Sequence, residues 1–328
     1  MKILFLEPAG KGIYYEEFAR ALKRKAEVLQ YGPGLPGYSS SHDIENILNL
    51  YRDVKGGGPD LILFGFGWER DTYSEAGYDS NIHGADLNLQ STHIKKAFIL
   101  NKEYKNLEQK LRFIREKGVD IGFTVHHDYK KYGKETSKEF YQLPFAANPD
   151  VFRDYGMEKS IDIGFSGNMF NYGVYKNTGI MGSHFQNIRE RVYNELLRSV
   201  YRGRSIWWNS DAGRFLYGEG YGKLINSSKV WLNTPSAVQL VGTRFYEIIA
   251  SKSLLFCRDS EHSYSDLGFI DGETCVTFKD DLSDFETKLT YYLENDRDRE
   301  KIIESAYELF RERHTWGHRV EFLIEKCS

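Results

Sequence analysis

Cysteine is scarce in this 328-residue sequence, and no apolar run is long enough to cross a membrane. The three cysteines, Cys257, Cys275 and Cys327, are odd in number and far apart, so neither a disulfide framework nor a zinc site is expected. A membrane-spanning helix needs about 18 or more apolar residues in succession. The apolar start, Ile3 to Leu6, is too short for a signal peptide and predicts a first strand. These absences predict a cytoplasmic protein.

An excess of basic charge is also absent. The chain has 44 Lys and Arg against 47 Asp and Glu, a formal net charge of −3, so nothing draws it as a whole to nucleic acid or to an anionic membrane. The densest basic run, Lys23 to Lys25, ends an amphipathic helix, where cations suit the helix dipole. Hydrophobic content of 41% with 28% charged residues is ordinary for a globular protein, and the length allows two domains.

Apolar strand-like runs alternate with helical patterns through most of the chain, which predicts an α/β sheet. The strands predicted in the first half are Lys2–Leu6, Glu27–Tyr31, Leu61–Phe66, Ala97–Leu100, Ile121–Val125 and Phe140–Leu143. Helices are predicted between them, for example at Ile13–Lys25 and Asn106–Lys117. The glycine-rich turn after the first strand, with Gly10 and Gly12, lacks the full dinucleotide spacing.

The segment around Asn148-Pro149-Asp150 interrupts this pattern with turn-forming residues, so the first domain is predicted to span residues 1–150. A second α/β pattern follows over residues 151–315. Its predicted elements are strands Ser160–Phe165, Ser205–Trp208 and Thr274–Phe278, helices Phe185–Arg198 and Leu282–Asn295, and a helical tail Arg297–Lys326. Residues 316–328 are the part of this tail predicted to close back on the first domain. If two such sheets face one another, their carboxyl-end loops surround a cleft.

The segment from Tyr221 to Asp259 is the most informative part of the sequence. It reads as strand, loop and helix start, with Gly242 and Thr243 just before Arg244. A cation in the first turn opposes the helix dipole, but a bound phosphate removes that conflict because the amides and the guanidinium share the anion. Glu247 lies on the same helical face and could bind a vicinal diol such as a ribose. The alternative is an ordinary surface pair. Tyr221 and Lys223 precede this block and are further candidate donor contacts.

The same segment resembles the C-terminal domain of GT-B glycosyltransferases of the spore-maturation (CgeB-type) group. The resemblance rests on Leu224–Asn233, Thr243–Glu247, Ser253–Phe256 and the tail residues Tyr291–Leu293, Asp298-Arg299 and Arg313–Trp316. It implies a GT-B fold: two Rossmann-like domains facing across a cleft, with a C-terminal helix crossing back. It covers about the last hundred residues well.

The resemblance also implies donor contacts. Ser166, Gly167 and Asn168 would lie near the donor phosphates, and Gly10 and Gly12 would approach the donor from the first domain. In the related retaining group, a second glutamate binds the ribose, and Glu247 resembles it. The first glutamate of that motif is replaced by Gln239, so the donor-sugar contact that it makes is not expected here.

His126-His127-Asp128 follows a predicted strand directly, where cleft residues of such sheets lie. His126 is the preferred catalytic candidate: a histidine can accept a proton near neutral pH, and Asp128 could orient its other nitrogen. The alternative is a pair of strand-end histidines without a catalytic role. Adjacent histidines do not easily share one tetrahedral ion, so no metal is predicted. Trp68, Glu69 and Asp71 end another strand and are acceptor-side candidates, although such a tryptophan is more often core.

The sequence therefore predicts a metal-independent glycosyltransferase that uses a nucleotide-diphosphate sugar as substrate, needs no cofactor and retains anomeric configuration. Arg244 would neutralise the diphosphate and Glu247 would hold the ribose. The acceptor stays open among a glycan, a small molecule, a protein and a nucleic acid. Two rival hypotheses are a sugar-nucleotide epimerase on the same fold and a non-enzymatic sugar- or nucleotide-binding protein.

Overall fold

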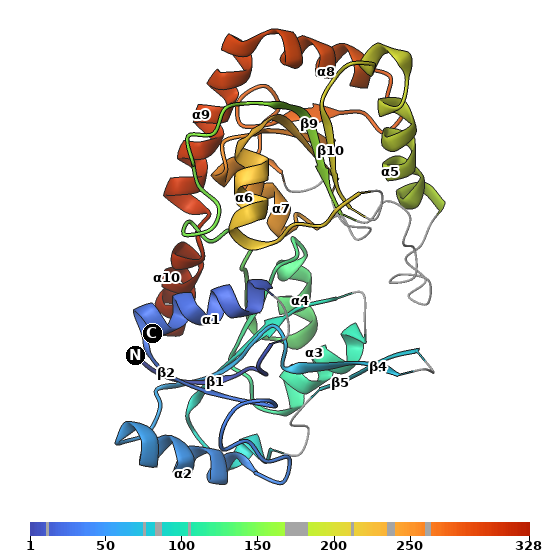
Figure 1. Cartoon of the computed structure of the whole chain (residues 1–328). Coiled ribbons are helices and arrows are strands. Elements are labelled where there is room, and N and C mark those ends of the chain that lie inside the picture. Colours follow the sequence, from blue (N-terminus) through green and yellow to red (C-terminus); the bar gives the residue numbers. More distant parts are fainter. Residues whose placement is uncertain are drawn as a thin grey trace. The chain divides into compact units, whose positions relative to one another are not determined.

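The computed structural model of the chain forms two compact units, here called unit 1 and unit 2 (Figure 1). Unit 1 comprises Met1–Pro144 with Trp316–Ser328, and unit 2 comprises Phe145–Thr315. The structure describes residues 1–10, 13–74, 77–82, 87–103, 106–167, 183–210, 213–234, 240–259 and 264–328. None of the helices among these residues has both the length and the apolar character needed to span a membrane.

The division at residues 144 and 145 falls six residues before the boundary predicted from sequence. The Ala147 N–H donates to the His314 carbonyl at 3.1 Å, and Ala147 forms a parallel bridge with Thr315. These bonds attach the segment before Asn148 to the end of unit 2. The turn at Pro149 therefore lies within unit 2.

Unit 1 is built on a parallel six-stranded sheet in the order β2-β1-β3-β6-β7-β8. Its strands are β1 (Lys2–Leu6), β2 (Glu27–Tyr31), β3 (Leu61–Phe64), β6 (Lys95–Leu100), β7 (Ile121–Thr124) and β8 (Glu139–Gln142). Its helices are α1 (Ile13–Lys25), α2 (Ile44–Lys55), α3 (Leu107–Glu116), α4 (Tyr129–Thr136) and α10 (Trp316–Cys327). Strands buried on both faces read as continuous apolar runs, which is why β1, β3 and β6 are apolar almost throughout.

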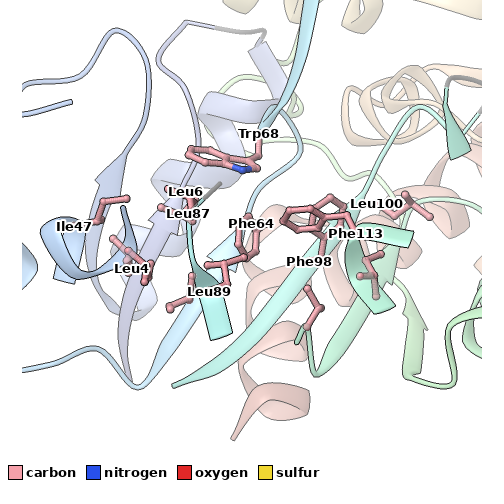
Figure 2. Close-up of a cluster of buried hydrophobic side chains, with 14 of the residues drawn as sticks. Leu4, Leu6, Ile47, Phe64, Trp68, Leu87, Leu89, Phe98, Leu100 and Phe113 are labelled. Carbon is pink, nitrogen blue, oxygen red and sulfur yellow. The ribbon is translucent and has the colours of Figure 1, made fainter. Parts of the chain in front are cut away.

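Aromatic rings occupy the centre of one core of unit 1 (Figure 2). The Phe64 ring lies 5.7 Å from Phe98 and 5.6 Å from Phe113, and Trp68 packs edge-on against Phe64 at 6.0 Å. Helix α2 adds Ile47 to this core. An antiparallel hairpin, β4 (Glu69–Ser74) and β5 (Gly77–Ile82), and a short 3-10 helix η1 (Leu89–Ser91) separate β3 from β6.

Unit 2 has a parallel five-stranded sheet in the order β10-β9-β11-β12-β13. Its strands are β9 (Ile161–Ser166), β10 (Ile206–Asn209), β11 (Ser228–Asn233), β12 (Leu254–Arg258) and β13 (Val276–Phe278). Its helices are α5 (Ser183–Leu196), α6 (Gly218–Asn226), α7 (Thr243–Ala250), α8 (Phe285–Glu294) and α9 (Asp296–Arg313), with 3-10 turns η2 (Ser199–Tyr201) and η3 (Ser265–Leu267).

The helical tail predicted over Arg297–Lys326 is two helices, α9 and α10, and not one. His314 and Thr315 interrupt it, since both bond to the segment at Ala147 and the His314 ring Nε2 lies 2.8 Å from the Leu267 carbonyl. The chain then passes from unit 2 into unit 1. There the Trp316 indole N–H donates to Glu17 of α1 at 3.1 Å, and its ring packs against Phe18.

Each sheet reverses its strand order once. In unit 1 the chain adds strands on opposite sides of β1, so the loops after β1 and β3 diverge there, and in unit 2 the loops after β9 and β11 do so. Open α/β sheets bind ligands at the carboxyl ends of the strands beside such a switch point. The two switch points are therefore the parts of the fold where a ligand site is expected.

Candidate active site

The end of β9 is fixed by a buried hydroxyl network in unit 2. Ser166 is 2% exposed and accepts hydrogen bonds from the Tyr221 hydroxyl at 2.7 Å and from the Trp231 indole N–H at 3.2 Å. Burial raises the pKa of Tyr221, the nearby Glu247 charge raises it further, and Arg244 opposes both. Ser166 and Tyr221 are thus buried and hydrogen-bonded to one another at the strand end, and their predicted contact with the donor stays a prediction.

Gly167 follows immediately and lies between two arginines. A Cβ added at Gly167 would lie 3.2 Å from the Arg244 Nη1 atom and 3.5 Å from the Arg189 Nη1 atom. The backbone φ of Gly167 is +116°, which L side chains rarely adopt. Two guanidinium groups therefore meet at a bare stretch of backbone beside the unit 2 switch point.

The two arginines reach Gly167 from different elements. Arg189 extends from α5 and donates from Nε to the Thr234 hydroxyl, just beyond β11, at 2.9 Å. Arg244 lies in the first turn of α7, and its side chain makes no hydrogen bond or ion pair with any residue that the structure describes. Like charges this close repel, so the arrangement favours binding of an anion.

Helix α7 starts at Thr243, as the sequence predicts. Gly242 precedes it with extended backbone, no side chain caps the helix start, and no acidic residue lies in the first turn. A Cβ at Gly242 would meet no atom of the described residues within 4 Å, so among these residues nothing covers that side of the first amides. The helix buries Phe245, Tyr246, Ile248, Ile249 and Ala250, while Thr243, Arg244 and Glu247 remain partly exposed. The uncapped amides, the helix dipole and the Arg244 guanidinium therefore all contribute positive potential at the start of α7.

Several predicted donor residues do not join this cluster. Lys223 pairs with Glu219 on its own helix at 3.0 Å, and its ammonium lies 5.5 Å from the centre of the Tyr155 ring. Asn168, and also Gln239, lie outside the described residues. The resemblance also implied Lys176, Arg189 and Arg191 as possible additional phosphate ligands, with plain solvated charges as the alternative. Of these, Arg189 joins the cluster, and its partner Thr234 is 45 positions away in sequence. Lys176 lies outside the described residues.

Polar groups also collect at the carboxyl edge of the unit 1 sheet. Glu7, directly after β1, is 1% exposed, and both of its carboxylate oxygens accept from the Gly67 N–H at 3.1 and 2.9 Å. A Cβ at Gly65 would lie 2.0 Å from a Glu7 oxygen, so this position needs a glycine. The two loops at the unit 1 switch point are therefore bonded together. Gly10 has a φ of +66° and, with Glu7, Tyr15 and Gln30, lines a pocket of about 220 Å³; Gly12 lies outside the described residues.

His126 is held by two hydrogen bonds, one at its backbone and one at its ring. Its own N–H donates to the Thr124 hydroxyl at 3.1 Å, and its Nδ1 accepts the Asp128 N–H at 3.2 Å. The Asp128 carboxylate is farther from Nδ1, at 3.6 Å. A nitrogen that accepts a hydrogen bond is unprotonated, so the neutral ring carries its proton on Nε2. This differs from the predicted role of Asp128: the backbone amide orients the ring, and the tautomer makes Nε2 a donor rather than a base.

Glu103 adjoins this histidine and was missed from the sequence. It lies three residues beyond the end of β6 and accepts a hydrogen bond from the Thr124 hydroxyl. Burial raises the pKa of Glu103, and the Asp128 charge adds to this, while the Thr124 hydroxyl and Lys110 lower it. Asn101, 2% exposed, donates to the Tyr15 hydroxyl at 3.1 Å beside it. Glu103 and Asn101 are polar residues that follow a buried strand closely, and this is the same sequence signal that pointed to His126.

The acceptor-side candidates fare differently. Trp68 is 2% exposed, and its ring packs in the hydrophobic core beside Phe64, so it is not placed to stack on a sugar (Figure 2). Its role is the core packing that the sequence kept as the alternative. Glu69 and Asp71 lie in β4, and their side chains are outside the described part of the structure.

The described residues contain one close group of potential metal ligands, His126, His127 and Asp128, whose ligand atoms lie within 4.8 Å of one another. The two imidazoles stack at 4.0 Å, and Nδ1 of His126 already accepts an amide N–H. One of the two His126 nitrogens is thereby occupied. Absence of a metal requirement stays a prediction.

Residues 178–325 match the family described as Glycosyl transferase-like. This segment includes Arg189, Tyr221, Arg244 and Glu247. No curated protein matches the chain in sequence.

Solved structures share the architecture over nearly the whole chain. HepE from Anabaena, in complex with UDP, has a TM-score of 0.65 at 10% identity, covering 99% of this chain and 99% of that one. A glycosyltransferase from Rickettsia africae has a TM-score of 0.61 at 14% identity, covering 99% and 97%. An E. coli trehalose-6-phosphate structure, bound with UDP-2-fluoro glucose, has a TM-score of 0.61 at 10% identity, covering 100% and 99%. The fold is therefore that of the GT-B proteins, with a Rossmann-like parallel sheet in each unit, as the sequence predicts.

Proposed function

We propose that this chain is a nucleotide-sugar-dependent glycosyltransferase that binds the donor diphosphate between Arg189, Arg244 and the start of α7. The observation that carries the proposal is the pair of guanidinium groups at the bare backbone of Gly167, beside the switch point of the unit 2 sheet. The match of residues 178–325 to a glycosyltransferase family and the UDP-containing GT-B neighbours support it. Assignment to the spore-maturation group rests on the segments named above and is part of the proposal.

The proposed chemistry is stabilisation of the departing nucleoside diphosphate. Negative charge grows on the diphosphate as the sugar leaves, and preorganised cations and amides stabilise that charge without reorganising. Arg189 is held by Thr234, and Arg244 projects from a helix whose buried face fixes it. Glu247, one turn after Arg244, would accept hydrogen bonds from the ribose hydroxyls. These groups supply the charge without a metal ion.

The first test is removal of each guanidinium. Arg244→Ala and Arg189→Ala should each lower kcat by about 100-fold, the size expected for losing one preorganised donor. Arg311→Ala, at an exposed position of α9, is the matched control and should leave the rate unchanged. UDP-glucose is the first donor to try, because UDP or UDP-sugar complexes occur among the neighbours. If folded variants, with native circular dichroism, transfer sugar as fast as the control, the diphosphate does not bind at these arginines.

We further propose retention of anomeric configuration. A retaining reaction needs no strong base on the acceptor, and the His126 tautomer, with its proton on Nε2, suits a hydrogen-bond donor to the transferred sugar. Proton NMR of the first-formed product measures the anomeric coupling directly, and an inverted product would contradict retention.

The two rival functions predict different outcomes. Release of an epimerised nucleotide sugar without an acceptor would instead favour the epimerase. Binding of UDP-sugar with neither transfer nor hydrolysis would favour the binding protein.

A further inference from the structure

The polar network behind His126 contains a relay from a carboxylate to the histidine backbone. Strands β6 and β7 are hydrogen-bonded neighbours, so the segments after their carboxyl ends meet. Glu103 follows β6, and Thr124 is the last residue of β7. The relay therefore joins two strand ends at one edge of the unit 1 sheet.

The directions of the hydrogen bonds in this relay are determined. The Thr124 hydroxyl has one hydrogen, which it donates to Glu103, and its oxygen accepts the His126 N–H at 3.1 Å. The next bond, from the Asp128 N–H to Nδ1 of His126, sets the ring tautomer. Thr124 is 0% exposed, so water does not replace a missing partner in this position. Every link from Glu103 to the imidazole is thus fixed by a specific partner.

We propose that Glu103 and Thr124 are positioning residues that hold His126 in the orientation and tautomer needed for sugar transfer. The inference rests on the proposed function, since it assigns His126 a contact with the transferred sugar. Glu103 acts through Thr124, and Thr124 acts through the backbone of residues 126–128. Both work at a distance from the reacting bond.

Burial disfavours the ionised form of Glu103, and the neighbouring hydroxyl and ammonium groups favour it. Desolvation raises the pKa of Glu103, whereas the Thr124 hydroxyl and the Lys110 ammonium favour its ionised form. Lys110 is itself 1% exposed and donates to the carbonyls of Asn101 at 2.8 Å and Lys102 at 2.9 Å, in the segment that leads to Glu103. The same lysine therefore shapes the loop and supports the carboxylate.

The test uses Thr124→Val and Glu103→Ala, which break the relay, beside Thr124→Ser and Glu103→Gln, which keep its acceptors and donors. The matched control is Thr136→Val, because Thr136 is also buried in unit 1 and its hydroxyl bonds to the Tyr132 carbonyl at 2.7 Å. We expect the two breaking variants to lose about 10- to 100-fold in kcat, the range for a displaced catalytic group. Thr124→Ser and Glu103→Gln should stay within a few-fold of the native rate. The calorimetric Kd for UDP should not change, since the UDP contacts are proposed in unit 2.

A second readout does not depend on transfer. In protein with 15N-labelled histidine, the native His126 ring should show a protonated Nε2 and an acceptor Nδ1, assigned by comparison with His126→Gln. Thr124→Val and Glu103→Ala should shift those signals, and Thr136→Val should not. Unchanged signals and a kcat equal to that of Thr136→Val would overturn the inference. If the native protein binds UDP but transfers no sugar, the proposed function fails, and the NMR comparison still decides whether the relay orients His126.

Discussion

Glycines carry much of the information at the residue scale because several of them stand where an added side chain would meet close neighbours. A Cβ at Gly164 would lie 2.1 Å from the Trp231 ring, and one at Gly65 would lie 2.0 Å from a Glu7 oxygen. At Gly167 the neighbours are two guanidinium groups rather than a ring or a carboxylate. A side chain there would occupy space that the diphosphate is proposed to use.

Gly167→Ala is therefore expected to weaken UDP binding by about tenfold or more, through occlusion and displaced guanidinium groups. It should also cost about 1–3 kcal/mol of unfolding free energy, because alanine is strained at a φ of +116°. Gly203→Ala is the control: Gly203 has a φ of +91°, with nothing within 4 Å of its added Cβ. Calorimetry with UDP and urea unfolding separate the two effects. Equal UDP affinity in both variants would contradict the placement of the phosphates.

The sequence pointed to some site residues and not to others for a physical reason. Arg244 stood out because its cation opposes the dipole of its own helix, a conflict visible within a few residues. Arg189 was only one of several possible phosphate ligands, and Glu103 was missed, because their partners Thr234 and Thr124 are 45 and 21 positions away in sequence. Trp68 had two readings from sequence, since a ring at a strand end serves a surface or, more often, a core, and the structure shows the core.

At the scale of elements, buried parallel strands were predictable and polar elements were not. Strands β1 and β2 match their predicted bounds: β1 is a continuous apolar run after Lys2, and three of the five residues of β2 are apolar. The hairpin β4–β5 has the sequences ERDTYS and GYDSNI, which carry almost no apolar pattern. The single predicted tail became two helices because His314 and Thr315 bond to a distant segment.

Helix α10 is expected to hold unit 1 together. Trp316 is 2% exposed. Its indole N–H donates to Glu17, and its ring packs against Phe18 and Phe66, so all three partners lie in the amino-terminal part of unit 1. Trp316→Ala should destabilise unit 1 by about 3–5 kcal/mol, as large-to-small changes of buried aromatic residues do. Hydrogen exchange should quicken in β1 and α1 and stay unchanged in β9 to β13. Glu325→Ala, exposed on the same helix, is the control. Faster exchange spread equally over both units would contradict this role.

At the scale of the whole molecule, donor binding should appear as selective stabilisation. A ligand at 100 times its Kd adds about 2.7 kcal/mol to the stability of the folded state. We expect nucleoside diphosphates to raise the Tm of the unit 2 transition, UDP among them, and nucleosides without phosphate to have little effect. If the site works without a metal, EDTA should change neither the shift nor the transfer rate. A shift that vanishes with EDTA would show that a metal ion joins the diphosphate.

The path of the chain between the units also bears on how the protein is made. Unit 2 is one continuous segment, Phe145–Thr315, whereas unit 1 needs both the first 144 residues and the last helix. During synthesis the amino-terminal residues emerge from the ribosome first, and domains fold as they become available. Here unit 1 cannot be completed until α10, which follows the whole of unit 2 in sequence, has been synthesised. The apolar surface that Trp316 covers, around Phe18 and Phe66, stays exposed until then, and transiently exposed apolar surface is prone to aggregation.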